Sequence, residues 1–110
     1  MLEIKPLKND LFLLSLEKQE KAFLMKGILY VVHKEEKKQN QDTEALLNWK
    51  QVLQKLQKNS DLLIEFTYDE IDYLHHALYF FKDSSLNQLE QKQAHDLFLQ
   101  LDAYFPQEKE

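Results

Sequence analysis

The sequence FTYDEIDYLHHALYFFK contains a capping box formed by Thr67 and Glu70. In a capping box the first side chain accepts a hydrogen bond from the backbone N–H three residues later, and the second side chain reaches back to the first backbone N–H. We therefore expect a helix to begin at Tyr68. Asp69 and Glu70 in its first turn also lie at the positive end of the helix dipole, which stabilises the same start.

This predicted helix is apolar over more than half of its circumference. At about 100° per residue, one apolar stripe consists of Ile71, Leu74, Leu78 and Phe81. A second stripe beside it consists of Tyr73, Ala77 and Phe80. The remaining polar sector contains Asp69, Asp72, His76 and Tyr79. A helix of this kind packs against neighbours on two sides, so we place it at the centre of the domain.

Glycine and proline are too scarce in this chain for an all-β fold. The 110 residues contain one Gly and two Pro, whereas the strong helix formers Leu, Lys, Glu and Gln are abundant. A chain of this length suits a single domain with one core. The predicted fold is therefore mainly α, a compact four-helix bundle-like domain covering residues 1–110. Its helices are expected at about residues 10–38, 43–58, 68–82 and 86–105.

The ends of the other helices are specified less fully. Asn9 or Asp10 is expected to cap the first helix, and Asp42 or Thr43 the second. The first helix either continues through Gly27 or breaks there, because glycine weakens a helix interior. The candidate caps and stop of the last helix are Ser84 or Ser85 and Pro106.

Two short segments have the character of β-strands. Residues 2–5 alternate apolar and polar side chains before Pro6, and the residue before a proline favours an extended backbone. Residues 62–66, LLIEF, fit either a brief strand or a last helical turn. If both segments are strands, we expect them to pair with each other as a two-stranded ribbon, since the sequence shows no other partner.

The charged residues argue against nucleic acid as a direct ligand. All fourteen basic residues are lysine and the net charge is −5. Bidentate recognition of guanine and of phosphate depends mainly on arginine. Residues 1–60 contain 11 Lys against 8 Asp and Glu, whereas residues 61–110 contain 3 against 11. This uneven distribution suits a charged protein partner or head-to-tail self-association.

Asp72 and His76 are one helical turn apart, so both side chains could contact one cation. A specific metal site needs at least a third ligand. The candidates for it are Glu65, Asp69, His33 and His95. We favour the simpler interpretation, in which His76 hydrogen-bonds Asp72, His75 borders the core and no metal binds.

The sequence shows no catalytic motif. It has no cysteine, no GxSxG or HExxH pattern, and too little glycine for a loop that holds phosphate. We therefore expect no enzyme activity, no catalytic residue and no cofactor.

The sequence also lacks features of secretion or membrane insertion. The first residues, MLEIKPLKND, do not combine a charged region with an apolar one as a secretory signal does. The longest apolar runs, LFLLSL and ILYVV, are shorter than the roughly 18 residues of a membrane span. We therefore expect a soluble cytoplasmic protein without membrane contact.

Aromatic side chains indicate where a partner would bind. Trp49 lies on the apolar seam of the second predicted helix, where it serves as a core residue or as an anchor between subunits. Tyr73, Tyr79 and Phe80 lie away from the main stripe, so they either pack on a second helix or join a binding patch. The candidate partner-binding residues are Asp69, Asp72, Tyr73, His76, Tyr79 and Phe80.

The segment LIEFTYDEIDYLHHALYFF, followed by LEQKQAHDLFLQLDAYF, resembles a known group of proteins. These are small uncharacterised helical proteins of low-GC Gram-positive bacteria and their phages. In them a strand-like run, a capped helix, a turn and a last helix ending in an aromatic residue recur. The resemblance covers about half of the chain and implies a phage or prophage accessory protein.

We thus predict a small non-enzymatic protein-interaction module that binds and modulates a host or phage protein. One alternative is a structural homo-oligomer, such as a homodimer or a component of a phage particle. A second alternative is an acidic protein that mimics or regulates nucleic acid.

Overall fold

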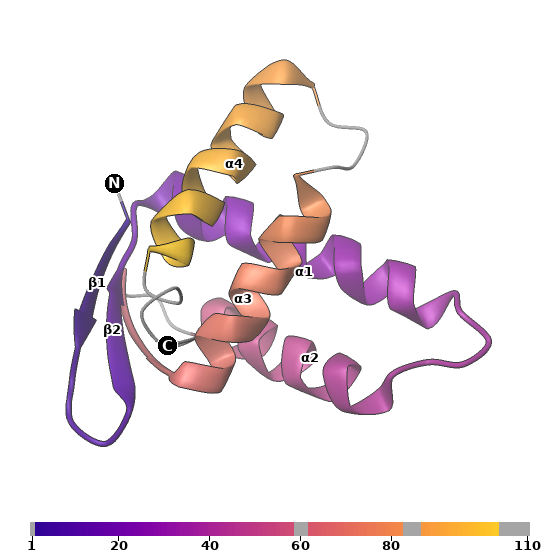
Figure 1. Cartoon of the computed structure of the whole chain (residues 1–110), viewed down its shortest axis with the longest axis horizontal. Coiled ribbons are helices and arrows are strands. Elements are labelled where there is room, and N and C mark those ends of the chain that lie inside the picture. The colour runs from indigo at the N-terminus through magenta and orange to yellow at the C-terminus, as the bar shows by residue number, and fades with distance from the viewer. Residues whose placement is uncertain (1, 59–61, 83–86, 104–110) are drawn as a thin grey trace.

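The computed structural model describes residues 2–58, 62–82 and 87–103, and these form four helices and a small three-stranded antiparallel sheet (Figure 1). The elements in chain order are β1 (Glu3–Pro6), β2 (Leu11–Ser15), α1 (Lys18–Glu36), α2 (Thr43–Lys58), β3 (Leu63–Thr67), α3 (Tyr68–Phe81) and α4 (Gln88–Asp102). The predicted mainly helical fold class is confirmed. Within the described ranges no helix is both long enough and apolar enough to cross a membrane.

Helix α3 begins at the predicted capping box. The Thr67 hydroxyl accepts from the Glu70 N–H at 3.1 Å, and Glu70 Oε1 accepts from the Thr67 N–H at 2.8 Å. The same Glu70 oxygen also binds Lys55 Nζ of α2 at 2.7 Å. The predicted core stripe is buried, namely Ile71, Leu74, Leu78 and Phe81. Because α3 packs against α1, α2 and α4 and continues directly from β3, it is the central helix, as predicted.

The sheet has the order β1-β2-β3, with both pairs antiparallel. The strand interpretation of residues 62–66 is therefore correct in type, since β3 covers Leu63–Thr67. The predicted pairing of these residues with residues 2–5 is wrong, because β2 lies between the two outer strands and bonds to both.

One face of the sheet closes the core. Phe12 and Leu14 of β2 lie opposite Phe66 and Ile64 of β3, and Leu14 also lies opposite Ile4 of β1. Leu14, Ile64 and Phe66 are buried in the same cluster as the inner side chains of the helices. The short sheet thus supplies one wall of the core that the helices complete.

The helix predicted over residues 10–38 is wrong in its first part. Residues 11–15 form β2, and α1 begins only at Lys18. Asn9 and Asp10, predicted as helix caps, form the turn between β1 and β2 with φ angles of 62° and 59°. Asn and Asp tolerate this left-handed conformation better than other residues with a side chain. The chain therefore reverses direction where the sequence pattern suggested a helix start.

Helix α1 continues through Gly27 without the break that was considered. Gly27 is buried, and a Cβ atom placed there would lie 3.2 Å from Cδ2 of Phe81 in α3. The Phe81 ring lies between Phe23 and Tyr30, with ring centroids at 5.3 and 5.5 Å. Glycine at this position therefore allows the close approach of α1 and α3.

The starts of α2 and α4 use short polar caps. Helix α2 begins where predicted, and Asp42 Oδ1 accepts from the Ala45 N–H at 3.0 Å. Helix α4 begins two residues later than predicted, and Asn87 Oδ1 caps it by accepting from the Glu90 N–H at 2.8 Å. The predicted caps Ser84 and Ser85, the last two residues of the predicted helix and the stop Pro106 lie outside the described residues.

Candidate functional site

A hollow between α2 and α3 brings together four of the six candidate partner-binding residues. Its volume is about 330 Å³. The lining residues are Glu44, Asn48, Asp69, Asp72, Tyr73 and His76. Three of these are carboxylates and none is a lysine, so the hollow carries negative charge. We call it the acidic pocket.

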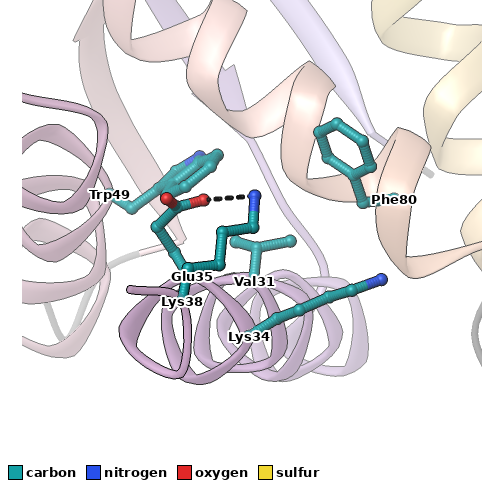
Figure 2. A pocket seen from close by; sticks show the side chains of 6 residues that line it. All are labelled: Val31, Lys34, Glu35, Lys38, Trp49 and Phe80. Carbon is teal, nitrogen blue, oxygen red and sulfur yellow. Dashed lines mark ion pairs between the residues drawn. The ribbon is translucent and has the colours of Figure 1, made fainter. Parts of the chain in front are cut away.

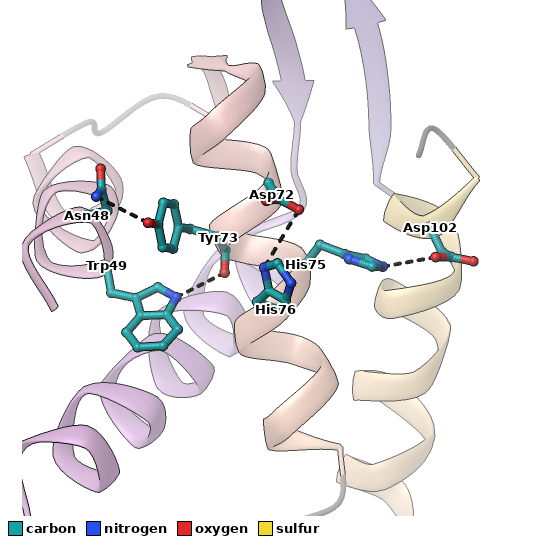
Figure 3. Close-up of polar contacts among 7 residues, drawn as sticks. All are labelled: Asn48, Trp49, Asp72, Tyr73, His75, His76 and Asp102. Carbon is teal, nitrogen blue, oxygen red and sulfur yellow. Dashed lines mark hydrogen bonds and ion pairs between the residues drawn. The ribbon is translucent and has the colours of Figure 1, made fainter. Parts of the chain in front are cut away.

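Tyr73 is held in place by contacts from α2 (Figure 3). Its ring meets the Trp49 ring edge to face, with centroids 5.9 Å apart and an interplanar angle of 83°. Trp49 Nε1 donates to the Tyr73 backbone carbonyl at 3.1 Å. Asn48 Nδ2 lies 3.4 Å from the Tyr73 hydroxyl. These contacts orient the hydroxyl toward the polar side of the α2–α3 contact.

The charge of the acidic pocket changes the acidity of this hydroxyl. Burial raises the pKa of Tyr73, and the negative charges of Glu44, Asp42 and Asp69 raise it further, whereas the Asn48 hydrogen bond lowers it. Carboxylates from both the α2 and the α3 side therefore act on the Tyr73 hydroxyl. A cationic group placed in the acidic pocket would be stabilised by the same field.

The predicted hydrogen bond between His76 and Asp72 is not formed, because Nδ1 and Oδ1 lie 3.7 Å apart, a distance that fits only an ion pair. Both side chains are about half exposed, so the interaction between them is weak. Within the described part of the chain, no group of three or more His, Asp or Glu residues is placed to hold a metal ion. Asp69 lines the same hollow as this pair, but neither it nor another described candidate for the third ligand completes a metal site there.

Phe80 and Tyr79, the other two candidate residues, point to different neighbours. Phe80 is 46% exposed and lines a second hollow, which we call the Trp49 pocket (Figure 2). The residues that line the Trp49 pocket are Val31, Lys34, Glu35, Lys38, Trp49 and Phe80. Tyr79 instead contacts Phe98 of α4 at 5.7 Å between ring centroids, and the Lys82 ammonium lies 4.8 Å from the Tyr79 centroid. The predicted surface is thus divided among three locations.

The sequence interpretation missed the residues that other helices contribute to these pockets. Glu44 and Asn48 come from α2, and Lys34 comes from α1. Glu44 and Asn48 are four residues apart and share a face of α2. Both residues lie in the turn of α2 just before Trp49, which the sequence places on the apolar seam of this helix. Their closeness to Trp49 was the sequence signal that they border the central helix.

His75 borders the core, as predicted. Its ring stacks on Phe98 with centroids 4.5 Å apart and an interplanar angle of 13°. Its Nε2 lies 3.1 Å from Asp102 Oδ1, and this contact links α3 to α4 (Figure 3). Burial lowers the pKa of His75, although the Asp102 carboxylate partly opposes this effect.

We expect His75 to reduce stability at mildly acidic pH. Because its pKa in the folded protein lies below the ordinary value of 6.5, the unfolded chain binds more protons near and below that pH. The contribution of His75 to stability is therefore complete above about pH 6.5 and is lost as the pH falls. Urea unfolding at about pH 7.5 and 5.5 should show a smaller decrease for His75→Gln than for the unmodified protein. Equal decreases for the two proteins would contradict this role.

Comparison with known proteins finds no match among family models, curated proteins or solved structures.

Proposed function

We propose that the protein is a small protein-interaction module whose acidic pocket binds a basic segment of a partner protein. The observation that carries this proposal is the convergence of Glu44, Asp69 and Asp72 from two helices on one hollow. Their charges are not balanced by a lysine among the lining residues. A lysine or arginine side chain of a partner would supply the missing positive charge.

The surroundings of the acidic pocket suit a protein ligand. Tyr73 offers an aromatic ring against which the aliphatic part of a lysine or arginine side chain can pack. Phe80 lies further along α3 and exposes nearly half of its surface. Aromatic residues are enriched at the centres of protein interfaces, and polar residues surround them at the rim. The resemblance described above suggests a host or phage protein as the partner, and the acidic pocket adds that its contacting segment is basic.

Replacing Asp69 and Asp72 together with asparagine is expected to weaken partner binding by about tenfold or more, because two charge contacts are removed. The stability of the variant should stay within about 1 kcal/mol of the unmodified protein, since both side chains lie on the surface of α3. Affinity capture from the source cell, followed by measurement of the captured partner's affinity at two salt concentrations, tests this expectation. Binding should also weaken as the salt concentration rises.

A matched control removes the same charge elsewhere. Glu3→Gln combined with Asp96→Asn changes two exposed carboxylates that lie outside the acidic pocket. This variant should keep its affinity, and equal weakening in both variants would contradict a specific role for the pocket. Light scattering tests for self-association. If the unmodified protein and the control variant are oligomers but the Asp69 and Asp72 variant is a monomer, the pocket serves self-association instead.

A further inference from the structure

The Trp49 pocket lies where α1, α2 and α3 meet and is separate from the acidic pocket. Its volume is about 180 Å³. Val31 and Trp49 are buried and provide apolar walls, while the Phe80 ring of α3 lies on the side opposite Trp49 (Figure 2). These side chains suit an apolar group of about the size of one amino-acid side chain.

The rim of this pocket carries one positive charge that is not balanced locally. Glu35 accepts from the Asp42 N–H at 2.9 Å and pairs with Lys38 Nζ at 3.1 Å. Both contacts lower the pKa of Glu35, so its carboxylate stays ionised and neutralises Lys38. Lys34 has no carboxylate partner within the described residues, and its ammonium lies 5.7 Å from the Tyr30 ring centroid. Lys34 is therefore available to an anionic group beside the apolar walls.

The two pockets are close enough for one ligand to occupy both. Trp49 lines one pocket and Tyr73 lines the other, and their rings are in contact. Asp72 and Phe80 are two helical turns apart on α3, a rise of about 12 Å. An extended peptide covers this distance with about three or four residues.

We propose that the Trp49 pocket binds an apolar side chain of the partner peptide and that Lys34 pairs with a carboxylate on the residue after it. This proposal rests on the proposed function, because the same peptide places a basic side chain in the acidic pocket. The bound segment then has the order basic, apolar, acidic. Its charges match the negative pocket at one end and Lys34 at the other, which fixes the direction of binding.

A synthetic peptide with blocked ends tests this order directly. It contains a lysine, about three glycine or serine residues, a leucine and a glutamate. Trp49 is the single tryptophan of the chain and lies between the two pockets, so its fluorescence reports binding at either of them. The peptide should produce a saturable change in this fluorescence. Replacing its leucine with serine, or its glutamate with lysine, should each weaken binding about tenfold.

A charge exchange distinguishes pairing with Lys34 from a general effect of charge. The unmodified protein should prefer the peptide that ends in glutamate over the one that ends in lysine. In Lys34→Glu this preference should reverse, so that the peptide ending in lysine binds more tightly. Lys37→Glu makes the same change of charge at a neighbouring exposed residue outside the pocket, and it should keep the original preference. An unchanged preference in Lys34→Glu, or no saturable response to the first peptide, overturns the proposal.

The same measurements separate this proposal from the proposed function. If replacing the peptide's lysine or neutralising Asp69 and Asp72 weakens binding, but the leucine and glutamate have no effect, only the Trp49 pocket proposal fails. If the leucine and glutamate matter but the lysine does not, the acidic pocket proposal fails. Equal affinity of a small aromatic carboxylate and the full peptide would show that the pocket takes a small molecule, and this would overturn the peptide proposal.

Discussion

Replacing Gly27 with leucine is expected to lower the free energy of unfolding by about 3 kcal/mol, because the new side chain must enter space that Phe81 occupies. A single Cβ atom at this position would already lie 3.2 Å from the Phe81 ring. Phe23 and Tyr30 pack against that ring, so it has little room to move aside. Typical domains have only about 5–15 kcal/mol of stability, so this loss is large.

Urea unfolding followed by circular dichroism measures this effect, and two variants provide the comparison. Ala22→Leu places a leucine side chain at an exposed position of α1, so it should change stability by less than about 0.5 kcal/mol. The change in the free energy of unfolding of Gly27→Ala should lie between those of Gly27→Leu and Ala22→Leu. Alanine gains about 1 kcal/mol in helix propensity, and this gain opposes the cost of the tight Phe81 contact. Equal stability of Gly27→Leu and the unmodified protein would show that α1 and α3 separate easily.

Replacing Trp49 with alanine should cost about 3–5 kcal/mol, since it removes a large buried side chain. The indole is 7% exposed, packs on Tyr73 and donates to its backbone carbonyl. Because it lies between the acidic pocket and the Trp49 pocket, its removal should also abolish binding to both. The free energy of unfolding measures the first effect, and the affinity for the peptide described above measures the second. That affinity must be measured by calorimetry, because the variant lacks the tryptophan whose fluorescence reports binding.

Two further variants separate packing from hydrogen bonding. Trp49→Phe keeps an aromatic ring but loses the indole N–H, so it should cost about 1–2 kcal/mol. Leu47→Ala truncates a side chain of the same helix that is 58% exposed, and it should have little effect. If Trp49→Ala and Leu47→Ala are equally stable, the packing role of Trp49 is wrong.

The parts of the fold that follow from local contacts were predictable from sequence. The capping box of α3 joins Thr67 and Glu70, which are only three residues apart. The sequence pattern alone therefore predicts both of its hydrogen bonds. The start of α2 is similar, because Asp42 bonds to the backbone of Ala45. No tertiary contact is needed to recognise either start.

Strand β2 was not predictable by the same reasoning. Its apolar residues continue the spacing of the following helix, and Asn9 and Asp10 suit a helix cap as well as a turn. The strand forms because Leu14 lies opposite Ile64 of β3 as well as Ile4 of β1, and these side chains pack in the core. The pairing with β3 joins segments that are distant in the sequence, and propensity alone does not show it.

The candidate site was predictable only within one helix. Helical periodicity placed Asp69, Asp72 and His76 in the polar sector and Tyr73 in the second apolar stripe, and the structure brings all four to one pocket. The contribution of Glu44 depends on how α2 packs, which periodicity does not specify. Tyr79 and Phe80 are neighbours in sequence but differ by about 100° around the helix, so they reach α4 and the Trp49 pocket respectively.

The position of β2 in the sheet has a consequence for the order of folding. Its pairing with β1 spans a short turn and forms with little loss of chain entropy, whereas its pairing with β3 closes a loop that contains all of α1 and α2. Early formation of these two helices shortens the effective loop. When β3 docks, the Tyr68 N–H also bonds to the Asp10 carbonyl at 3.2 Å. Completion of the sheet and anchoring of the first turn of α3 therefore belong to one cooperative step.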